Sequence, residues 1–388
     1  NEYDTNFNIN LSKKFTQSNG AWTKLVVQLE NWSDNYDNNV GDYKIDLTEL
    51  YIEMGNVPMF TGAFKDAKIV AGKKKWDAQQ VEILDYYYQD VKGTGLGLEG
   101  IRLWNGSLNL TYISNDFKDG ELSNIEGKKA EDVRAYKAKY THGDISGEVM
   151  YAHATDNDKI KKYKNNLENW NRDAADDGFY AGLYYQPDNF FGLEGKGQHY
   201  LQYATGILAG EGIGKIETDA NKRAANDAVT YQLGLGGTVR LGDRTHMLVS
   251  YRGLRAQNIE ARKTVSYWHD VDNPTNMSPY VGSWRAKDLE TDALVLRPIY
   301  YINQNLDLWM EAGIARKDTE SYSGTTEDHL LYKISAGPQL KYYVGNAETS
   351  LRLFVTYIGD KTERRENGVT TKSTVEDVLT GFQVSAWW

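Results

Sequence analysis

The stretch YDTNFNINLSKKFTQSNGAWTKLVVQLE, residues 3–30, decides the fold. In its first part, Tyr3, Thr5, Phe7, Ile9 and Leu11 alternate with Asp or Asn at every intervening position. Strict alternation of this kind is the pattern of a β-strand with one apolar face and one polar face. The Asn-Gly pair at 19–20 predicts a tight turn, and residues 23–30 return with a second alternating run. The stretch therefore predicts a hairpin whose second face is strongly polar.

The rest of the chain repeats this pattern, with tight turns and long polar segments in strict succession. We expect tight turns at 105–106, 142–144, 188–189, 242–243, 303–305 and 345–346. We expect long polar segments at 32–42, 77–95, 115–129, 155–177, 206–227, 256–287, 317–329 and 359–374. Short turns on one side and long loops on the other are typical of an outer-membrane β-barrel. The pattern contains roughly seventeen strand-like segments and no linker, so residues 1–388 are predicted to form one domain.

Composition agrees with a membrane barrel and excludes several other classes. No run approaches the roughly 18 consecutive apolar residues that a membrane-spanning helix requires, so any spanning segments must be strands. The 28 Tyr and 10 Trp suit interfacial aromatic girdles. The chain has no cysteine, which excludes disulfides and thiolate chemistry, and its net charge of −10 argues against a nucleic-acid partner. A soluble β-protein remains the alternative; its apolar strand faces would pack on a second sheet instead of requiring detergent.

Catalysis and metal binding receive little support from the sequence. No Gly-x-Ser-x-Gly elbow, His-Glu-x-x-His pair or phosphate-binding glycine loop is present, so we expect no enzyme and no cofactor. Two acidic groups, His153 with Asp156 and Asp158, and Asp173 with Asp176 and Asp177, are candidates for Ca²⁺ binding. The simpler interpretation of both groups is a solvated acidic loop.

One segment carries a family resemblance. Residues 67–99, AKIVAGKKKWDAQQVEILDYYYQDVKGTGLGLE, resemble without a gap the segment of the maltoporin family that ends one strand and forms its inward-folded third loop. The matched landmarks are Ala71-Gly72-Lys73, Val81, Asp85, Tyr87-Tyr88, Asp90, Gly93, Gly95, Gly97 and Leu98-Glu99. Weaker agreement continues in family order to Trp387-Trp388.

The resemblance implies a sugar-specific porin in the outer membrane of a Gram-negative bacterium. The family barrel has eighteen strands, forms homotrimers and lets oligosaccharides diffuse passively. Asn1-Glu2 and Thr5 are similar to the family's second strand, which implies that a first strand precedes residue 1. The expected partners are therefore an oligosaccharide, outer-membrane lipid and two further copies of the chain.

A sugar channel needs aromatic planes for the apolar ring faces and polar groups for the hydroxyls. Trp387 faces inward by strand parity and is similar to the family's periplasmic stacking residue, although a girdle Trp is the alternative. Tyr87 matches the loop tyrosine that narrows the family channel, and Asp85 matches a hydroxyl-binding carboxylate beside it; for both, packing of the loop is the alternative. Trp309, inward by parity between Asp307 and Glu311, is either another stacking surface or a space-filling residue.

Elsewhere the chain departs from the family pattern. The family's aromatic track falls on Asn6, Asn346 and a site near His199 and Tyr200, and its constriction charges fall on Thr48, Ala78 and Gln80. Glu82 stands where the family has a histidine, and Asn8 adds a second amide to the polar face that carries Asn6. These departures put maltodextrin in doubt as the substrate and leave another sugar open. They also leave open a general or ion-conducting porin, whose selectivity would depend on lumenal charges such as Lys24, Glu30, Lys333, Lys341 and Arg352.

Overall fold

A computed structural model describes the backbone of residues 4–34, 45–84, 86–115, 132–155, 175–216, 224–259, 265–269, 277–281, 287–321, 324–344 and 347–387. Within these residues, no helix is long and apolar enough to cross a membrane.

Almost all of the described chain is β-structure. The described residues include three short 3-10 helices, η1 (Gly62–Phe64), η2 (Glu82–Leu84) and η4 (Gly206–Leu208). The strands of the first half are β1 (Asp4–Thr16), β2 (Trp22–Asp34), β3 (Ile45–Gly55), β4 (Lys68–Val81), β5 (Tyr86–Leu103), β6 (Gly106–Asn115), β7 (Asp132–His142), β8 (Ile145–Thr155), β9 (Asp177–Tyr185) and β10 (Asn189–Phe190). Those of the second half are β11 (Leu193–Thr205), β12 (Val229–Gly242), β13 (Thr245–Gln257), β14 (Val265–His269), β15 (Met277–Val281), β16 (Asp288–Asn303), β17 (Leu306–Glu320), β18 (Thr326–Val344), β19 (Ala347–Glu366) and β20 (Val369–Trp387).

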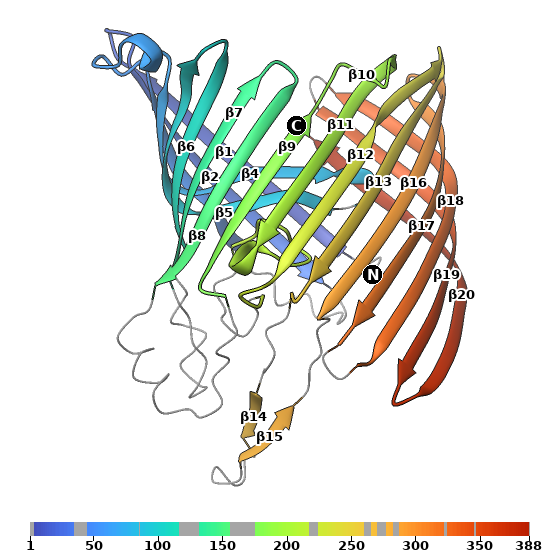
Figure 1. Cartoon of the computed structure of the whole chain (residues 1–388). Coiled ribbons are helices and arrows are strands. Elements are labelled where there is room, and N and C mark those ends of the chain that lie inside the picture. Colours follow the sequence, from blue (N-terminus) through green and yellow to red (C-terminus); the bar gives the residue numbers. More distant parts are fainter. Residues whose placement is uncertain are drawn as a thin grey trace.

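The strands form one antiparallel sheet in which each long strand pairs with the next. Eighteen strands belong to this sheet within the described residues, including the two-residue β10, while β14 and β15 form a separate hairpin. Figure 1 shows that the sheet curves round an interior. The all-β antiparallel fold is confirmed. Within the described residues no ladder joins β1 to β20, and the strand expected before residue 1 stays a prediction.

The first hairpin shows how residue alternation sets the two faces of the sheet. β1 pairs with β2 so that Asn8 lies opposite Glu30 and Leu11 opposite Val27. Because side chains alternate across a strand, each face keeps one chemical character along the ladder. The apolar face carries Phe7, Ile9 and Leu11, and these side chains remain exposed in the single chain. An exposed apolar face on a curved sheet requires lipid or another apolar partner.

The two ends of the sheet differ as the sequence predicts. Tight connections join β5 to β6, β7 to β8, β12 to β13 and β16 to β17 at one end, the upper end in Figure 1. Longer connections join the strands at the other end, where several of the predicted polar segments lie outside the described residues.

Two of the predicted long polar segments are wrong. Residues 359–374 do not form a loop, because β19 runs to Glu366 and β20 begins at Val369. The chain turns at Asn367 and Gly368, which have φ values of 50° and 79°, as a two-residue hairpin turn requires. The segment 317–329 shrinks likewise to residues 321–325 between β17 and β18. Outside the membrane both faces of a strand contact water, so a strand can continue there with polar residues on both faces. Polar composition alone therefore does not mark the end of a strand.

The predicted segment 77–95 is a folded hairpin that enters the interior (Figure 1). β4 continues to Val81 and β5 begins at Tyr86, and we call residues 75–92 the inward hairpin. At its base, Trp76 lies over the strand glycines, so that a Cβ atom at Gly97 would come within 2.7 Å of Cζ3 of Trp76. The Trp76 Nε1 donates a hydrogen bond to the Gly93 carbonyl at 3.0 Å. The small residues of β5 thus leave room for the indole ring.

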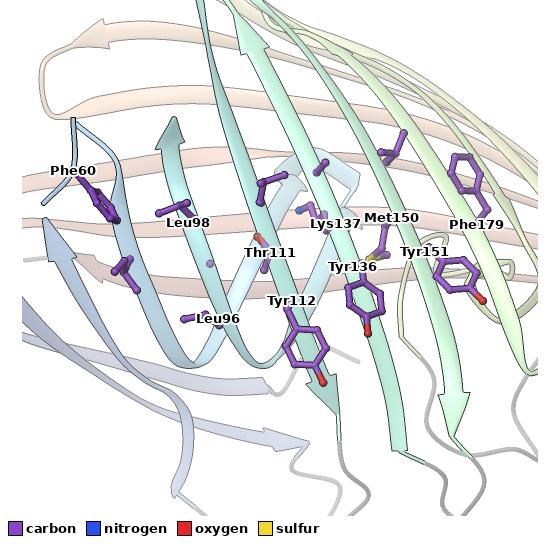
Figure 2. Close-up of a pocket in the computed structure, with 15 residues that line it drawn as sticks. Phe60, Leu96, Leu98, Thr111, Tyr112, Tyr136, Lys137, Met150, Tyr151 and Phe179 are labelled. Carbon is purple, nitrogen blue, oxygen red and sulfur yellow. The ribbon is translucent and has the colours of Figure 1, made fainter. Parts of the chain in front are cut away.

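The outer face carries an apolar groove over β5–β9 with a row of tyrosines (Figure 2). Tyr112, Tyr136 and Tyr151 lie side by side, each close to the strand end that leads into a long connection. The rings of Tyr112 and Tyr136 are 5.4 Å apart. Tyrosines at one height with an apolar surface beyond them form the aromatic girdle expected at a membrane interface.

Candidate functional site: the lumen

Tyr88 fixes the tip of the inward hairpin to the inner wall. Its side chain is 1% exposed and stacks on Tyr200 of β11, with ring centroids 4.3 Å apart and planes 6° apart. The Tyr88 hydroxyl accepts hydrogen bonds from Nε2 of Gln186 at 3.2 Å and of Gln198 at 3.1 Å. Gln186 follows the end of β9 and Gln198 lies on β11, so both contacts come from residues more than ninety positions away in the sequence. The hairpin therefore holds a defined position inside the barrel.

A buried ladder of amides continues this attachment. Gln202 Nε2 donates to the Tyr88 carbonyl at 2.6 Å, and Gln232 Nε2 donates to Gln202 Oε1 at 2.8 Å. Gln232 Oε1 accepts from the Tyr86 hydroxyl at 2.8 Å and from Arg252 Nε at 3.2 Å. Both glutamines are 1% exposed. A buried polar network in which each member is paired gives a single rigid arrangement.

Ion pairs hold the other side of the hairpin. Asp77 forms ion pairs with Lys137 and with Lys139 of β7, the latter at 2.8 Å between Nζ and Oδ1. Lys137 also lies 3.1 Å from Glu148 of β8, which accepts a hydrogen bond from Gln89 at 3.0 Å. Lys137 and Glu148 are almost fully buried, so loss of either partner would leave an uncompensated charge.

The wall formed by β1–β3 presents amides and carboxylates. Asn8 Nδ2 donates to Glu30 Oε1 at 3.0 Å, and Lys75 Nζ lies 2.6 Å from the same oxygen. The Lys75 amide donates to Glu49 Oε1 at 2.7 Å, which attaches the base of the hairpin to β3. Groups of this kind can exchange hydrogen bonds with the hydroxyls of a passing solute.

The wall formed by β16–β19 is cationic. Arg297 Nε donates to Glu311 Oε2 at 2.7 Å, and Lys333 Nζ lies 3.6 Å from the other oxygen of Glu311. The Arg352 guanidinium lies 4.8 Å from the ring centroid of Trp309, which is 6% exposed. The structure thus brings together two of the predicted site residues, Trp309 and Arg352. It also shows that Arg352 covers the indole ring.

The other predicted site residues fall in different environments. Tyr87 is 48% exposed on the hairpin, between the partly buried Tyr86 and the buried Tyr88, and is available to a solute. Tyr200 is 3% exposed and gives its ring face to Tyr88, so it supports the hairpin. Asn8 lies on the β1 wall beside Glu30.

Several predicted residues lie outside the described part of the structure. Asp85 and Asn346 are outside the described residues, and the side chains of Trp387, Glu82 and Asn6 are likewise outside them. The backbone register pairs Trp387 with Glu348 and Gln383 with Arg352 on adjacent strands. Alternation therefore places position 387 on the same face of the sheet as Arg352.

Sequence reasoning missed the residues that fix the hairpin, Gln202, Gln232 and Arg252. Their signal was weak: each is a polar residue at an inward position of an alternating strand, as are many residues that merely face water. What singles them out is burial, and burial depends on where the hairpin lies.

The described residues give no support for a metal site. Within the described residues, no group of three or more His, Asp or Glu side chains is placed to hold a metal ion. Asp156, Asp158 and Asp173 of the two acidic groups lie outside that part, so the Ca²⁺ sites are untested.

A curved antiparallel sheet with an apolar outer face, a tyrosine girdle and a polar interior narrowed by a folded hairpin defines an outer-membrane porin. Comparison with known proteins agrees with this class. The chain belongs to the LamB porin family, whose model matches residues 1–388. It is therefore an outer-membrane channel protein.

Two relatives of similar sequence are named maltoporins. A maltoporin of Vibrio cholerae serotype O1 is 23% identical over 405 residues, covering 100% of this chain and 87% of that protein. Maltoporin 1 of Aeromonas salmonicida is 25% identical over 347 residues, covering 84% of this chain and 70% of that protein. The outer membrane protein opdK from Pseudomonas aeruginosa superposes with a TM-score of 0.47 at 10% identity, covering 99% and 93% of the two chains.

Proposed function

We propose that this porin is a passive channel that prefers oligosaccharides over other solutes of similar size. The observation that carries the proposal is the inward hairpin, which presents the exposed ring of Tyr87 from a rigid base formed by Tyr86 and Tyr88. Amides and carboxylates on the β1–β3 wall supply acceptors and donors for hydroxyls. Relatives named maltoporin support the same interpretation.

Osmotic swelling of proteoliposomes tests this preference. In a sugar-preferring channel, a trisaccharide enters faster than a polyethylene glycol of matched hydrodynamic radius. In a general porin the two solutes enter at the same rate, because only size matters. Equal rates would contradict the proposal and favour the ion-conducting alternative.

Tyr87 provides a specific variant for this assay. Tyr87→Ala should reduce the rate advantage of the trisaccharide while leaving entry of the polymer unchanged. The matched control is Tyr231→Ala, since Tyr231 is 54% exposed and lies on the outer face of β12, one position from the inward Gln232. If both substitutions changed the rate advantage equally, Tyr87 would have no specific role in the passage of sugar.

The homotrimer implied by the family resemblance is part of this proposal. Crosslinking of the purified porin in detergent should give a ladder that stops at three chains. A ladder that stops at one chain would contradict the trimer without bearing on sugar preference.

A further inference from the structure

Two cations of the β16–β19 wall share a single carboxylate, and a third lies near them without an ion-pair partner among the described residues. Arg297 and Lys333 both approach Glu311, at 2.7 Å and 3.6 Å. The third cation, Arg352, has no carboxylate within ion-pair distance among the described residues. We call Arg297, Lys333 and Arg352 the lumenal cation cluster. Its positive excess contrasts with the net charge of −10 for the whole chain.

Arg352 is held by neutral partners only. Its Nη2 donates to Gln339 Oε1 at 2.9 Å, and its Nη1 donates to Gln383 Oε1 at 3.5 Å. Asp307 is already paired, because it lies 2.5 Å from Lys341 Nζ. Glu348, four residues from Arg352 on the same face of β19, forms no ion pair with it. Arg352 is therefore positioned against Trp309 with no carboxylate in direct contact among the described residues.

A second unpaired arginine lies behind the inward hairpin. Arg252 is 8% exposed, and its guanidinium lies 3.6 Å from the ring centroid of Tyr86. Its Nη2 is buried and has no hydrogen-bond partner in the described part of the chain. Arg252 does not itself reach a solute, but its charge adds to the positive potential of the lumen. Walls of low dielectric focus such a potential on the solute path.

We propose that the oligosaccharides preferred by this channel carry carboxylates, as uronic-acid oligomers do, and that the lumenal cation cluster recognises them. Arg352 is the recognising group, because a guanidinium binds a carboxylate through two parallel hydrogen bonds. Exchange of the Gln339 and Gln383 amides for a carboxylate replaces neutral acceptors with an anionic one, so that the hydrogen bonds of the guanidinium become part of a bidentate ion pair. This inference rests on the proposed function, since it assumes that oligosaccharides enter the channel.

The test compares two sugars that differ only in charge. Wild-type channels in planar bilayers at low salt are titrated with a neutral gluco-oligosaccharide and with its C6-oxidised glucuronate counterpart of equal length and linkage. The dissociation constant for block should be about tenfold lower for the glucuronate oligomer, which corresponds to about 1.4 kcal/mol. The advantage should shrink at 1 M salt, where the Debye length falls to roughly 3 Å.

Variants assign the effect to the cluster. Arg352→Gln should remove most of the advantage, so that the dissociation constants for block by the two oligomers come within about twofold of each other. The matched control is Arg240→Gln, because Arg240 is an exposed arginine already paired with Glu194 at 2.6 Å and with Asp243 at 3.1 Å. Arg240→Gln should keep the full advantage.

Each contrary outcome is informative. Equal or stronger block by the neutral oligomer overturns the inference and leaves sugar preference intact. Absence of block by both oligomers overturns the proposed function as well. A zero-current potential in a KCl gradient that favours chloride, without preference for the glucuronate oligomer, would make the cluster a general anion filter and also overturn the inference.

Discussion

Release of the inward hairpin by Tyr88→Ala is the most instructive perturbation. Tyr88 is fully buried against Tyr200, and its hydroxyl accepts two amide donors. Truncation of a buried aromatic residue to Ala costs about 3–5 kcal/mol, and a stacked pair contributes about 0.5–1.5 kcal/mol of this beyond its buried area. Since about 1.4 kcal/mol is a factor of ten, a loss of about 3 kcal/mol raises the fraction of channels with a detached hairpin about a hundredfold.

Single-channel recording detects this release. Tyr88→Ala channels should show a larger mean conductance and excess current noise, because the hairpin no longer narrows the lumen at one position. Tyr88→Phe should be intermediate, since it removes only the hydroxyl and leaves two amide donors without an acceptor, at about 1–3 kcal/mol. Tyr231→Ala is the control, because Tyr231 is exposed on the outer face of β12 and does not line the lumen. Wild-type conductance and noise in Tyr88→Ala would refute the argument that this contact fixes the hairpin.

Three further substitutions test the fold by urea titration of the barrel in detergent micelles. Asp77→Asn should destabilise the porin by about 3–5 kcal/mol because it leaves the buried Lys137 with one carboxylate fewer, and an unchanged midpoint would contradict the ion-pair assignment. Gly72→Ala should cost about 1–3 kcal/mol, since Gly72 has φ +132° and a Cβ atom there would lie 2.3 Å from the Leu50 carbonyl oxygen. Gly147→Ala is its control and should be nearly neutral, because a Cβ atom at Gly147 would have nothing within 4 Å. Leu201→Lys on the outer face should cost about 2–4 kcal/mol, whereas Asn10→Lys on the inner face should have little effect; equal losses would reverse our assignment of the two faces.

Local alternation was enough to predict the barrel. Residues 3–30 specify both strands, the tight turn between them and which side chains share a face. Each of these features depends on residues that are near neighbours in the sequence. The inward fold of residues 77–95 was expected from the family resemblance, and the structure adds that it is a β-hairpin whose register shifts at two places. Residues 359–374 were misread because their polar composition is as typical of a strand outside the membrane as of a loop.

The arrangement of the lumen could not be predicted in the same way. Tyr88 meets Gln202 across more than a hundred residues, and Arg352 meets Trp309 across two strand pairings. Contacts of this kind depend on the register of several strands and on the curvature of the sheet, neither of which a single strand encodes. Parity gave the correct face for Trp309 and Arg352, but it gave no indication that they are in contact. It also gave no indication that Tyr200 would be buried beneath the hairpin.

The most direct test of sugar preference is single-channel conductance of the purified porin, titrated with neutral and acidic oligosaccharides. The account predicts saturable, reversible block by oligosaccharides, at concentrations where a polyethylene glycol of the same size leaves the current unchanged. A current that falls equally with sugar and polymer, in proportion to solution conductivity, would contradict it.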